Sequence, residues 1–365
     1  MIGRFPWMGG GALMKSTLAS LYSEEDGFGL QSRLRPARKE IWAIGGGKGG
    51  VGKSLTTANI SICLALMGKK VVSIDLDLGG ANLHTCLGTN IPETSLSDFL
   101  TRKVSRFQDL ITPTPIKNLS IISGAQDEFG MANLKQLEKA KILNHLEEVD
   151  ADYIILDLGA GTTLNTLDFF IAADKGIMTT LPEPTAIENT YRFIKSVYHR
   201  KLKLCEELLE VSHLIDQAMN AKLNENISPS EAIMGLTQKN PHLAPIIKRE
   251  ISEFNPSLII NQVRTQSDID IGFSMKLICK KYFGFNLDYI GYLDYDQTVW
   301  QSVKKRKPLI TEFPHSALID NFENIHLVST LFGSVQIDEC DQQAGKAVCA
   351  HTGVSENAFC RDWFQ

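Results

Sequence analysis

The sequence predicts an α/β fold, a three-layer sandwich in which helices cover both faces of a mostly parallel central sheet. The first observation behind this prediction is that short apolar runs alternate with helical patterns along most of the chain. Strands that alternate with helices are joined by crossovers, so neighbouring strands run parallel and are buried on both faces. The second observation is that a glycine-rich loop and several Asp and Asn residues follow the apolar runs. Ligands of such sheets bind beyond the carboxyl ends of the strands.

Length and composition are those of a globular chain. It has 365 residues, of which 43% are hydrophobic and 22% charged, and this favours one large domain. No apolar run approaches the roughly 18–20 residues that cross a bilayer, and we expect no signal peptide. The formal charge of −5 argues against a protein coated in nucleic acid. Seven scattered cysteines without a C-x-x-C pair predict reduced thiols and a cytoplasmic location.

Three parts of the chain differ in composition. Residues 1–38 are rich in Gly, Ser and Arg and predict a flexible N-terminal tail, whereas the polar residues 334–365 predict a disordered C-terminal tail. The alternating pattern of the folded domain fills residues 39–333. Between about 201 and 255, helical patterns follow one another without strands, which predicts a helical insertion. A cap, a proline and a glutamate in Ser228-Pro229-Ser230-Glu231 predict a helix start inside it.

The first predicted strand, Glu40–Ile44, leads into a loop that fits G-x-x-x-x-G-K-[S/T] from Gly47 to Ser54. Glycines let such a loop curl so that its backbone N–H groups point at phosphate oxygens. Lys53 can reach the β and γ phosphates, and the Ser54 hydroxyl can hold Mg²⁺. The predicted phosphate-binding residues are Gly47, Lys48, Gly49, Gly50, Val51, Gly52, Lys53 and Ser54. The fold is therefore predicted to be that of a P-loop NTPase, although a glycine-rich turn without a ligand is the structural alternative.

The remaining elements follow from apolar spacing and from caps. Ile60, Leu64 and Met67 lie at helical spacing in a predicted helix from Ser54 to Met67, whose amino end adds a positive dipole to the loop. Thr185 and Glu188 form a predicted capping box that opens another helix. The other predicted strands are 71–75, 119–122, 153–156, 176–181, 258–261 and 287–293. The other predicted helices are 96–100, 133–149, 163–173, 185–197, 269–283, 297–306 and 318–332.

Carboxylates follow two of these strands. Asp75 and Asp77 come at the end of the strand 71–75, where they can orient water or hydrated Mg²⁺ beside a triphosphate. The alternative is that such aspartates cap the following turn. Asp157 ends the strand 153–156, an arrangement in which the carboxylate holds Mg²⁺ through water. The predicted metal ligands are Ser54, Asp75 and Asp157.

A second lysine, Lys48, makes the loop unusual, because a positive charge there can stabilise the charge that spreads during phosphoryl transfer. The run from Gly47 to Ser54 reads G-K-G-G-V-G-K-S. With it, the sequence resembles the deviant-Walker-A ATPases of the MinD/ParA superfamily. The resemblance implies that ATP and Mg²⁺ are the cofactors and that residues 39–333 form a P-loop ATPase domain. It also implies that the ATP-bound form is a homodimer in which Lys48 reaches the partner's nucleotide.

Further site residues follow from the same resemblance. The segment from Asp75 to Asn82 is similar to D-x-D-x-G-x-x-N of the MinD and FlhG branch and lacks the D-x-D-P-Q of plasmid ParA proteins. This implies that Asp77 positions the attacking water and that Asn82 is the switch I asparagine. Asn261, at the end of strand 258–261, resembles an asparagine that contacts adenine, since its amide offers a donor and an acceptor. A residue that only shapes a turn is the alternative. Lys48, Lys53 and Asp77 are the predicted catalytic residues.

The stretch from Pro182 to Lys195 resembles P-E-P-T-x-I-x-[D/N]-x-Y-x-x-I-K of FlhG (FleN) proteins. The resemblance implies a slow, partner-stimulated ATPase that controls flagellar number or polar placement. Alternatives are a MinD-type septum-site ATPase, a ParA-type cargo-positioning ATPase, and a nucleotide-sensing adaptor with little hydrolysis. An iron–sulfur carrier is disfavoured because no paired cysteines lie near the predicted switch residues. No tyrosine follows Tyr295, which disfavours a bacterial tyrosine kinase.

The predicted partners are a second copy of the chain and an unidentified protein activator. Peripheral contact with the inner face of the cell membrane is a further expectation, through Trp7 and the basic residues of 33–39. DNA is less favoured, because basic runs such as 199–203 and 304–307 are usually solvated helix faces. No Lys or Arg occurs between Lys307 and Lys346, so the helix 318–332 is expected to pack on the core rather than bind lipid.

Overall fold

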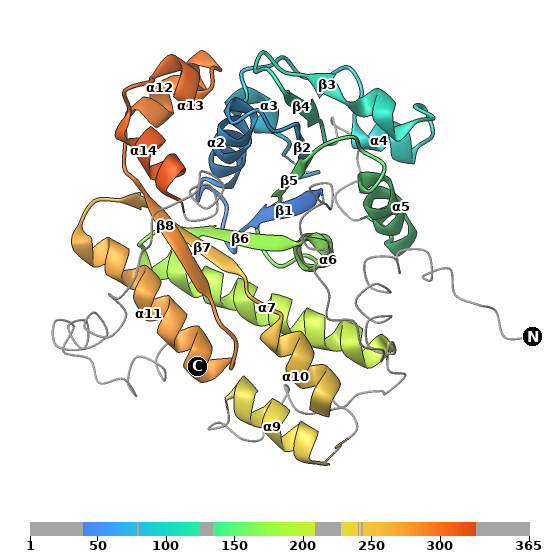
Figure 1. The fold of residues 1–365 in the computed structure, drawn as a ribbon, viewed down its shortest axis with the longest axis vertical. Coiled ribbons are helices and arrows are strands. Elements are labelled where there is room, and N and C mark those ends of the chain that lie inside the picture. The colour runs from blue at the N-terminus through green and yellow to red at the C-terminus, as the bar shows by residue number, and fades with distance from the viewer. Residues whose placement is uncertain are drawn as a thin grey trace, which may run out of the picture.

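The computed structural model describes residues 39–78, 80–124, 134–208, 228–239, 241 and 244–325. In this part of the chain an eight-stranded sheet has the order β3-β4-β2-β5-β1-β6-β7-β8 (Figure 1). The strands are β1 Glu40–Gly45, β2 Val71–Leu76, β3 Thr112–Pro113, β4 Leu119–Ile122, β5 Tyr153–Leu158, β6 Lys175–Thr180, β7 Ser257–Val263 and β8 Asp288–Asp294. Neighbouring strands are parallel except β3 and β4, which are antiparallel. The mostly parallel sheet is as predicted.

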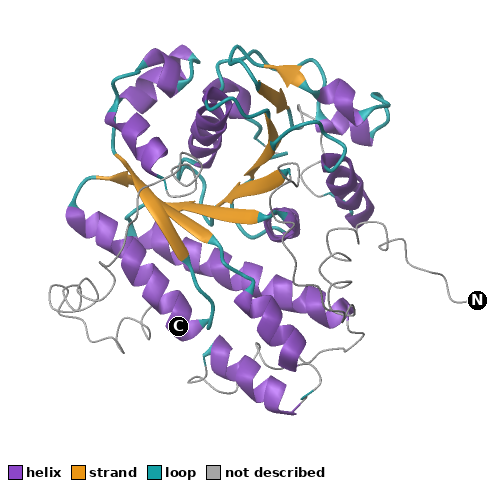
Figure 2. Cartoon of the chain, viewed as in Figure 1, coloured by secondary structure: helices purple, strands orange, loops and turns teal. Residues whose placement is uncertain are grey.

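Helices cover both faces of the sheet (Figure 2). One face packs against α2 Lys53–Leu66, α13 Leu309–Glu312 and α14 Ala317–Asn324. The opposite face packs against α5 Gln136–Leu146, α6 Leu164–Ala172, α7 Pro184–Leu208 and α11 Gln266–Tyr282. Helices α9 Pro229–Lys239 and α10 Ala244–Ser252 lie farther out, where α10 contacts α7 and α9 contacts α11. The remaining helices are α3 Leu83–Cys86, α4 Leu96–Leu100, the 3-10 helix η2 Phe107–Leu110 and α12 Thr298–Lys305.

Alternation along the strands explains the three layers. In β1, Ile41 and Ala43 belong to the core under α6 and α7, whereas Trp42 and Ile44 belong to the core under α2. Successive side chains of a strand point to opposite faces, so a strand without polar positions must be covered twice. The predicted three-layer sandwich is therefore confirmed.

Several predicted helix boundaries are wrong: α5 is shorter by three residues at each end than predicted, and α11 begins three residues earlier. Thr185 is not a cap, because α7 begins one residue earlier, at Pro184. Proline suits the first helical position, since it has no N–H to leave unbonded. The helix predicted over 318–332 ends at Asn324, and Ile325 already has extended backbone angles. Residues 326–332 lie outside the described part of the chain.

The region of the predicted insertion contains α9 and α10, and α9 begins as expected after Ser228. The Ser228 hydroxyl accepts from the Glu231 N–H, and the Glu231 carboxylate accepts from the Ser228 N–H. The boundaries 201–255 stay a prediction, and α7 continues past 201 to Leu208. Both predicted tails, 1–38 and 334–365, lie outside the described residues. Within the described chain, no helix is long and apolar enough to span a bilayer.

Candidate nucleotide-binding site

The phosphate loop joins the end of β1 to the start of α2. Gly50 and Gly52 have φ values of 79° and 94°, in the left-handed region that favours glycine. At Gly47, a Cβ atom would lie 2.0 Å from the Asn189 carbonyl oxygen of α7, so no side chain fits there. Gly52 is the residue before the first turn of α2, and it has no side chain that could accept a hydrogen bond from that turn. The backbone N–H groups at the start of α2 therefore have no capping side chain, as a phosphate site at a helix terminus requires.

Lys53 stands at the first position of α2 and is largely buried. Burial lowers the pKa of its ammonium, and the carboxylates of Asp157 and Asp77 oppose this shift. The buried ammonium of Lys53, which lies at the end of the phosphate loop, is therefore suited to binding phosphate oxygens.

Asp157 lies in β5 directly beside Asp75 of β2, in register across the parallel pair. The Thr57 hydroxyl donates to Asp157 Oδ1 over 3.1 Å. The other oxygen, Oδ2, is buried and has no hydrogen-bond partner among the described residues. Burial and then the charge of Asp75 raise the pKa of Asp157 to about 8, although the nearby hydroxyls of Ser54 and Thr57 and the charge of Lys53 lower it.

This arrangement fits Mg²⁺. Mg²⁺ in nucleotide sites keeps several waters and takes one or two protein oxygens together with phosphate oxygens. Ser54 and Asp157 would supply those protein oxygens. A hydrated cation would also give the buried Oδ2 of Asp157 the partner that it lacks among the described residues. The described residues contain no cluster of three or more His, Cys, Asp or Glu that could hold a metal. A Mg²⁺ ion here would take its remaining ligands from phosphate oxygens and water.

Asp75 has a different environment from Asp157. Its Oδ1 accepts from the Asp77 N–H over 3.0 Å, and its Oδ2 accepts from the Leu83 N–H over 3.0 Å. Burial raises the pKa of Asp75 to about 6, although these backbone hydrogen bonds lower it. The geometry favours the turn-capping alternative, because both oxygens hold the loop that leads into α3. The role of Asp75 as a metal ligand stays a prediction.

Asp77 and Asn82 bracket that loop. A Cβ atom at Gly159 would lie 3.4 Å from Asp77 Oδ1, so Asp77 faces the loop that follows β5. Asp77 also contributes to the electrostatic environment of Lys53. Asn82 donates through Nδ2 to the Gly80 carbonyl over 2.7 Å and precedes α3. Asp77 is thus placed near the phosphate end of the site, whereas Asn82 shapes the loop in this structure. The predicted roles of both remain untested.

Asn261 lies buried in β7 and contacts the phosphate loop directly. Its Nδ2 donates to the Val51 carbonyl over 2.8 Å, and its Oδ1 accepts from the Gln262 N–H over 2.8 Å. A Cβ atom at Gly52 would lie only 2.1 Å from Asn261 Nδ2. Asn261 therefore supports the loop, a role that its predicted place at a strand end did not reveal; β7 continues to Val263. Its contact with adenine stays a prediction.

Lys48 extends away from the buried acids. Its Nζ donates to Thr185 Oγ1 over 3.2 Å and forms an ion pair with Glu183 at 3.5 Å. The Lys48 side chain is 38% exposed and that of Glu183 is 57% exposed. Both unusual motifs of the sequence, the second loop lysine and the Pro182–Lys195 stretch, thus meet in space. Sequence reasoning selected each one but did not predict the contact.

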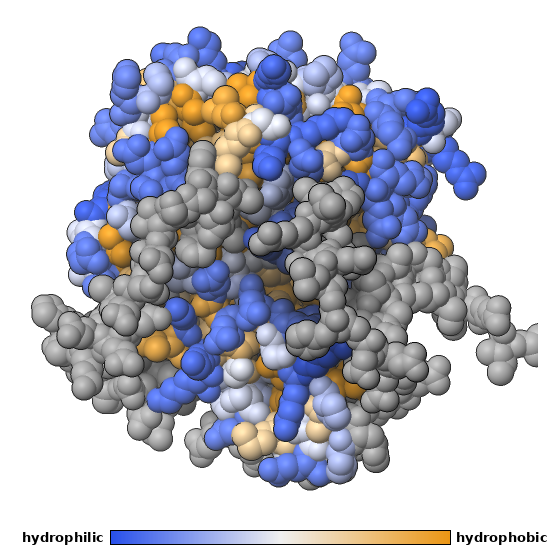
Figure 3. All heavy atoms as spheres, viewed as in Figure 1, coloured by the Kyte–Doolittle hydropathy of each residue, from blue (hydrophilic) through white to orange (hydrophobic). Residues whose placement is uncertain are grey.

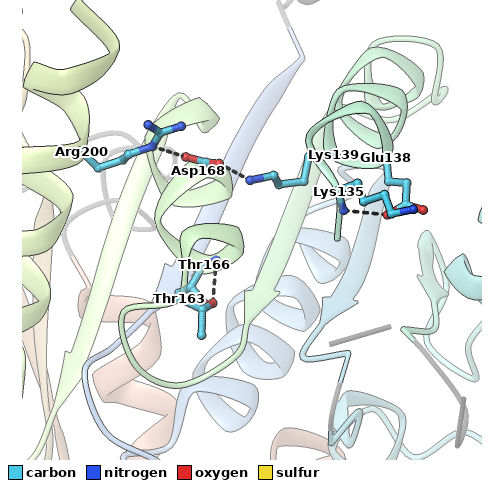
Figure 4. A network of polar contacts seen from close by, with 7 residues as sticks. All are labelled: Lys135, Glu138, Lys139, Thr163, Thr166, Asp168 and Arg200. Carbon is cyan, nitrogen blue, oxygen red and sulfur yellow. Dashed lines mark hydrogen bonds and ion pairs between the residues drawn. The ribbon is translucent and has the colours of Figure 1, made fainter. Parts of the chain in front are cut away.

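A second acid, Asp168 on α6, is largely buried (Figure 4). Asp168 forms ion pairs with Lys139 of α5 and, over 2.8 Å, with Arg200 of α7. Thr163 caps the same helix by accepting from the Thr166 N–H over 3.3 Å. The helix that follows the Gly159–Gly161 loop is therefore fastened to both of its neighbours.

These features define a class of protein: an α/β P-loop NTPase, with acidic strand ends grouped around an uncapped helix start. The AAA-domain family matches residues 39–211. The septum site-determining protein MinD of Helicobacter pylori is 31% identical over 257 residues, which is 69% of this chain and 93% of that protein. The chain belongs to the MinD/ParA family of P-loop ATPases.

Other relatives widen this comparison. The antiactivator FleN of Pseudomonas aeruginosa is 24% identical over 281 residues, 76% of this chain and 81% of that protein. The solved structure of MinD from Pyrococcus horikoshii, complexed with Mg-ADP, has a TM-score of 0.55 at 20% identity and covers 81% of this chain and 98% of that chain. The MinC:MinD complex of Aquifex aeolicus matches with a TM-score of 0.55 at 20% identity, over 82% and 98%. Likeness at these identities shows the fold alone.

Proposed function

We propose that this chain is an ATP-dependent, dimerising ATPase of the FlhG (FleN) type that controls flagellar number or polar placement. The observation that carries the nucleotide chemistry is the unpartnered, buried Oδ2 of Asp157 beside the uncapped start of α2. A carboxylate in that state is stabilised by a cation that arrives with a triphosphate.

The residues of the site divide the work. The loop from Gly47 to Ser54 binds phosphates through backbone N–H groups, and Lys53 binds the β and γ phosphates. Asp77 orients the attacking water. When bound, Mg²⁺ supplies neutralisation of phosphate charge. Gly161, with φ 86°, lets the loop after β5 adopt turns that other residues resist.

Lys48 completes a partner's site in this proposal. Its contacts with Glu183 and Thr185 are largely exposed, and such pairs contribute about 0–1 kcal/mol. Release of Lys48 toward a second nucleotide is therefore energetically accessible. Hydrolysis is slow until a protein activator binds the dimer. A similar protein of solved structure, MinD of Aquifex aeolicus, forms a complex with the protein MinC.

Two likenesses bear on the cellular role. The FleN likeness and the stretch from Pro182 to Lys195 support flagellar control. The alternative is a MinD-type septum-site ATPase, which the 31% identity to a MinD protein supports. ParA-type cargo positioning has less support, because D-x-D-P-Q is absent. A nucleotide-sensing adaptor with little hydrolysis is supported by the attachment of Lys48 to its own chain. Peripheral contact with the inner face of the cell membrane is also part of the proposal.

Mixed dimers of Lys48→Ala and Asp77→Ala chains test the shared site. If Lys48 acts in trans, one site of the mixed dimer keeps its own Asp77 and receives an intact Lys48 from the partner. Mixing should then restore ATPase activity that neither variant has alone. If Lys48 acts within its own chain, every site lacks one residue and mixing restores nothing. Lys53→Ala, which should not bind ATP, is the negative control.

Imaging of the tagged protein in its own cells, beside the deletion phenotype, tests the cellular role. Polar foci with altered flagellation support the FlhG-type function. Midcell division defects would instead establish the septum-site alternative, and nucleoid patterns a ParA-type role. Diffuse signal together with ATP binding but no hydrolysis would favour the adaptor.

A further inference from the structure

Helix α12 turns an apolar side toward solvent. Trp300 is 66% exposed and Val303 is 41% exposed, although both are large apolar residues. The inner side of the helix is made by Val299, which packs on the core under α2, and by the buried Ser302. Figure 3 shows apolar side chains at the surface among hydrophilic ones in the region of α12 and α13. The exposed apolar residues are therefore not needed for the packing of α12.

A run of four basic residues continues from this helix: Lys304, Lys305, Arg306 and Lys307, all exposed. Lys304 lies over the Trp300 ring, with its Nζ 4.8 Å from the ring centroid. Lys305 and Lys307 both pair with Glu312, at 2.7 and 3.0 Å. One carboxylate thus faces two lysines, so the run keeps an excess of positive charge.

Arg306 occupies a position that glycine would fill at lower energy. It ends α12 with φ 51° and ψ 49°, in the left-handed region. Helices commonly end on glycine in this conformation because other residues meet a steric penalty there. Backbone geometry therefore does not explain the arginine at this position. Binding of an anionic group by its exposed guanidinium would explain it.

We propose that the α12 face, defined by Trp300, Val303, Lys304, Arg306 and Lys307, binds an anionic lipid surface. Tryptophan favours the boundary between headgroups and acyl chains, and Lys and Arg reach the phosphates with their charged ends. If α12 were only a solvated helix without a ligand, the helix dipole would still explain Lys304 and Lys305, because positive charge is favourable at the carboxyl end. It does not account for an exposed Trp and Val on the same side.

Duplex DNA fits this face less well. DNA phosphates would satisfy the basic residues but would leave Trp300 and Val303 in water. A lipid surface satisfies both kinds of side chain. Lipid binding by the α12 face extends the membrane contact of the proposed function. Its cellular role rests on that proposed function, whereas lipid binding itself can be measured without ATP turnover.

The α12 face is also connected to the nucleotide site. The turn after α12 packs on the end of α3, where a Cβ atom at Gly88 would lie 2.5 Å from Pro308. Helix α3 begins at Leu83, whose N–H donates to Asp75. Surface binding through α12 thus occurs next to an element that the acidic loop positions.

Sedimentation with vesicles tests the proposal. The full-length chain is mixed with vesicles of phosphatidylcholine and phosphatidylglycerol in equal amounts, or of phosphatidylcholine alone. The Trp300→Ser/Lys304→Glu variant should bind the anionic vesicles less tightly by at least about tenfold. Leu277→Ser/Lys280→Glu on α11 is the matched control, because Leu277 is 56% exposed and Lys280 is exposed. This control should bind like the unchanged chain.

Arg306→Gly gives a test in which loss of fold is not expected. It removes the charge while favouring the left-handed backbone, so thermal stability should be kept and anionic vesicle binding reduced. Tryptophan emission supplies a direct readout: vesicles should shift it to shorter wavelength, and Trp300→Phe should reduce this shift more than Trp7→Phe does.

Unchanged vesicle binding in the α12 variants would overturn the proposal, as would equal loss in the α11 control. Tighter binding to duplex DNA than to anionic vesicles at equal phosphate would overturn the lipid partner. ATPase activity in the absence of vesicles should be equal in all these variants. Loss of ATPase function with retained vesicle binding would count against the proposed function alone.

Discussion

Asp157 is buried and the side chain of Asp168 is 11% exposed, yet the surroundings of these two carboxylates are opposite. Asp168 has a cation at each oxygen, Lys139 at Oδ2 and Arg200 at Oδ1, supplied by the helices on either side of it (Figure 4). Asp157 has a hydroxyl at one oxygen, none of the described residues hydrogen-bonded to the other, and the carboxylate of Asp75 beside it. Both oxygens of Asp168 form ion pairs, whereas Asp157 has the charge of Lys53 nearby but forms no ion pair within the described part of the chain. The difference separates an acid that stabilises the fold from one suited to a cation that comes with a ligand.

The largest expected effect is on the structural side of this comparison. Asp168→Ala removes the carboxylate that pairs with Lys139 and Arg200 in a largely buried cluster, and removal of one member of a buried ion pair costs about 3–5 kcal/mol. Urea denaturation should show a loss of unfolding free energy in this range. Glu188→Ala, which removes a more exposed pair with Arg192 on α7, is the control and should change stability by less than about 1 kcal/mol. A variant as stable as the unchanged protein would show that Asp168 does not fasten α6.

Asp157→Asn should have the converse result. Without nucleotide, the folded protein should be as stable as before, and more stable above about pH 8, where the unchanged Asp157 would carry a buried charge. Affinity for ATP in the presence of Mg²⁺ should fall by about tenfold to a hundredfold, the range for residues that hold a metal through water. Calorimetric titration with and without Mg²⁺ measures this. A similar loss of affinity without Mg²⁺ would contradict a role at the cation.

The pH dependence of stability should distinguish Asp157 from its asparagine variant. The pKa of Asp157 is raised to about 8 and that of Asp75 to about 6, from the ordinary 3.8, first of all by burial. The folded state therefore binds protons more tightly than the unfolded state. The stability that this pair contributes is present below pH 4 and is lost as pH rises through the raised pKa values. Thermal melts without Mg²⁺ should show a steeper decline between pH 4 and 8 for the unchanged protein than for Asp157→Asn. Parallel curves would contradict the assignment.

Thr57→Val should have the smallest effect. It removes the hydroxyl that donates to Asp157 Oδ1 but keeps the volume of the side chain. Loss of such a hydrogen bond costs about 1 kcal/mol, and the pKa of Asp157 should rise further, because this hydrogen bond lowers it. Affinity for ATP with Mg²⁺ should decline less than in Asp157→Asn. Denaturation and titration of both variants side by side measure the difference.

Much of the fold was accessible from local pattern. Strand β4 and helix α4 have the predicted limits, and the limits of the other predicted strands differ by a few residues at most. The prediction was wrong where a local signal competed with another: Thr185 and Glu188 matched a capping box, but Pro184 had already begun the helix. The short elements β3, α3, η2 and α13 were not predicted. The three helices have four residues each, about one turn, which is too short for apolar residues to repeat at helical spacing.

The sequence by itself determined the phosphate loop, the apolar strands that end in Asp75 and Asp157, and the alternation that makes the sheet parallel. These are local properties, since each needs only residues within one strand, loop or helix. The tertiary structure decided which groups meet: Asn261 with Val51, 210 residues apart, Lys48 with Thr185, 137 apart, and Asp168 with Arg200, 32 apart. It also decided that Asp157 is left unsatisfied while Asp168 is not. Burial and pairing depend on the packing of distant segments, and no spacing along the chain encodes which of two aspartates receives the cations.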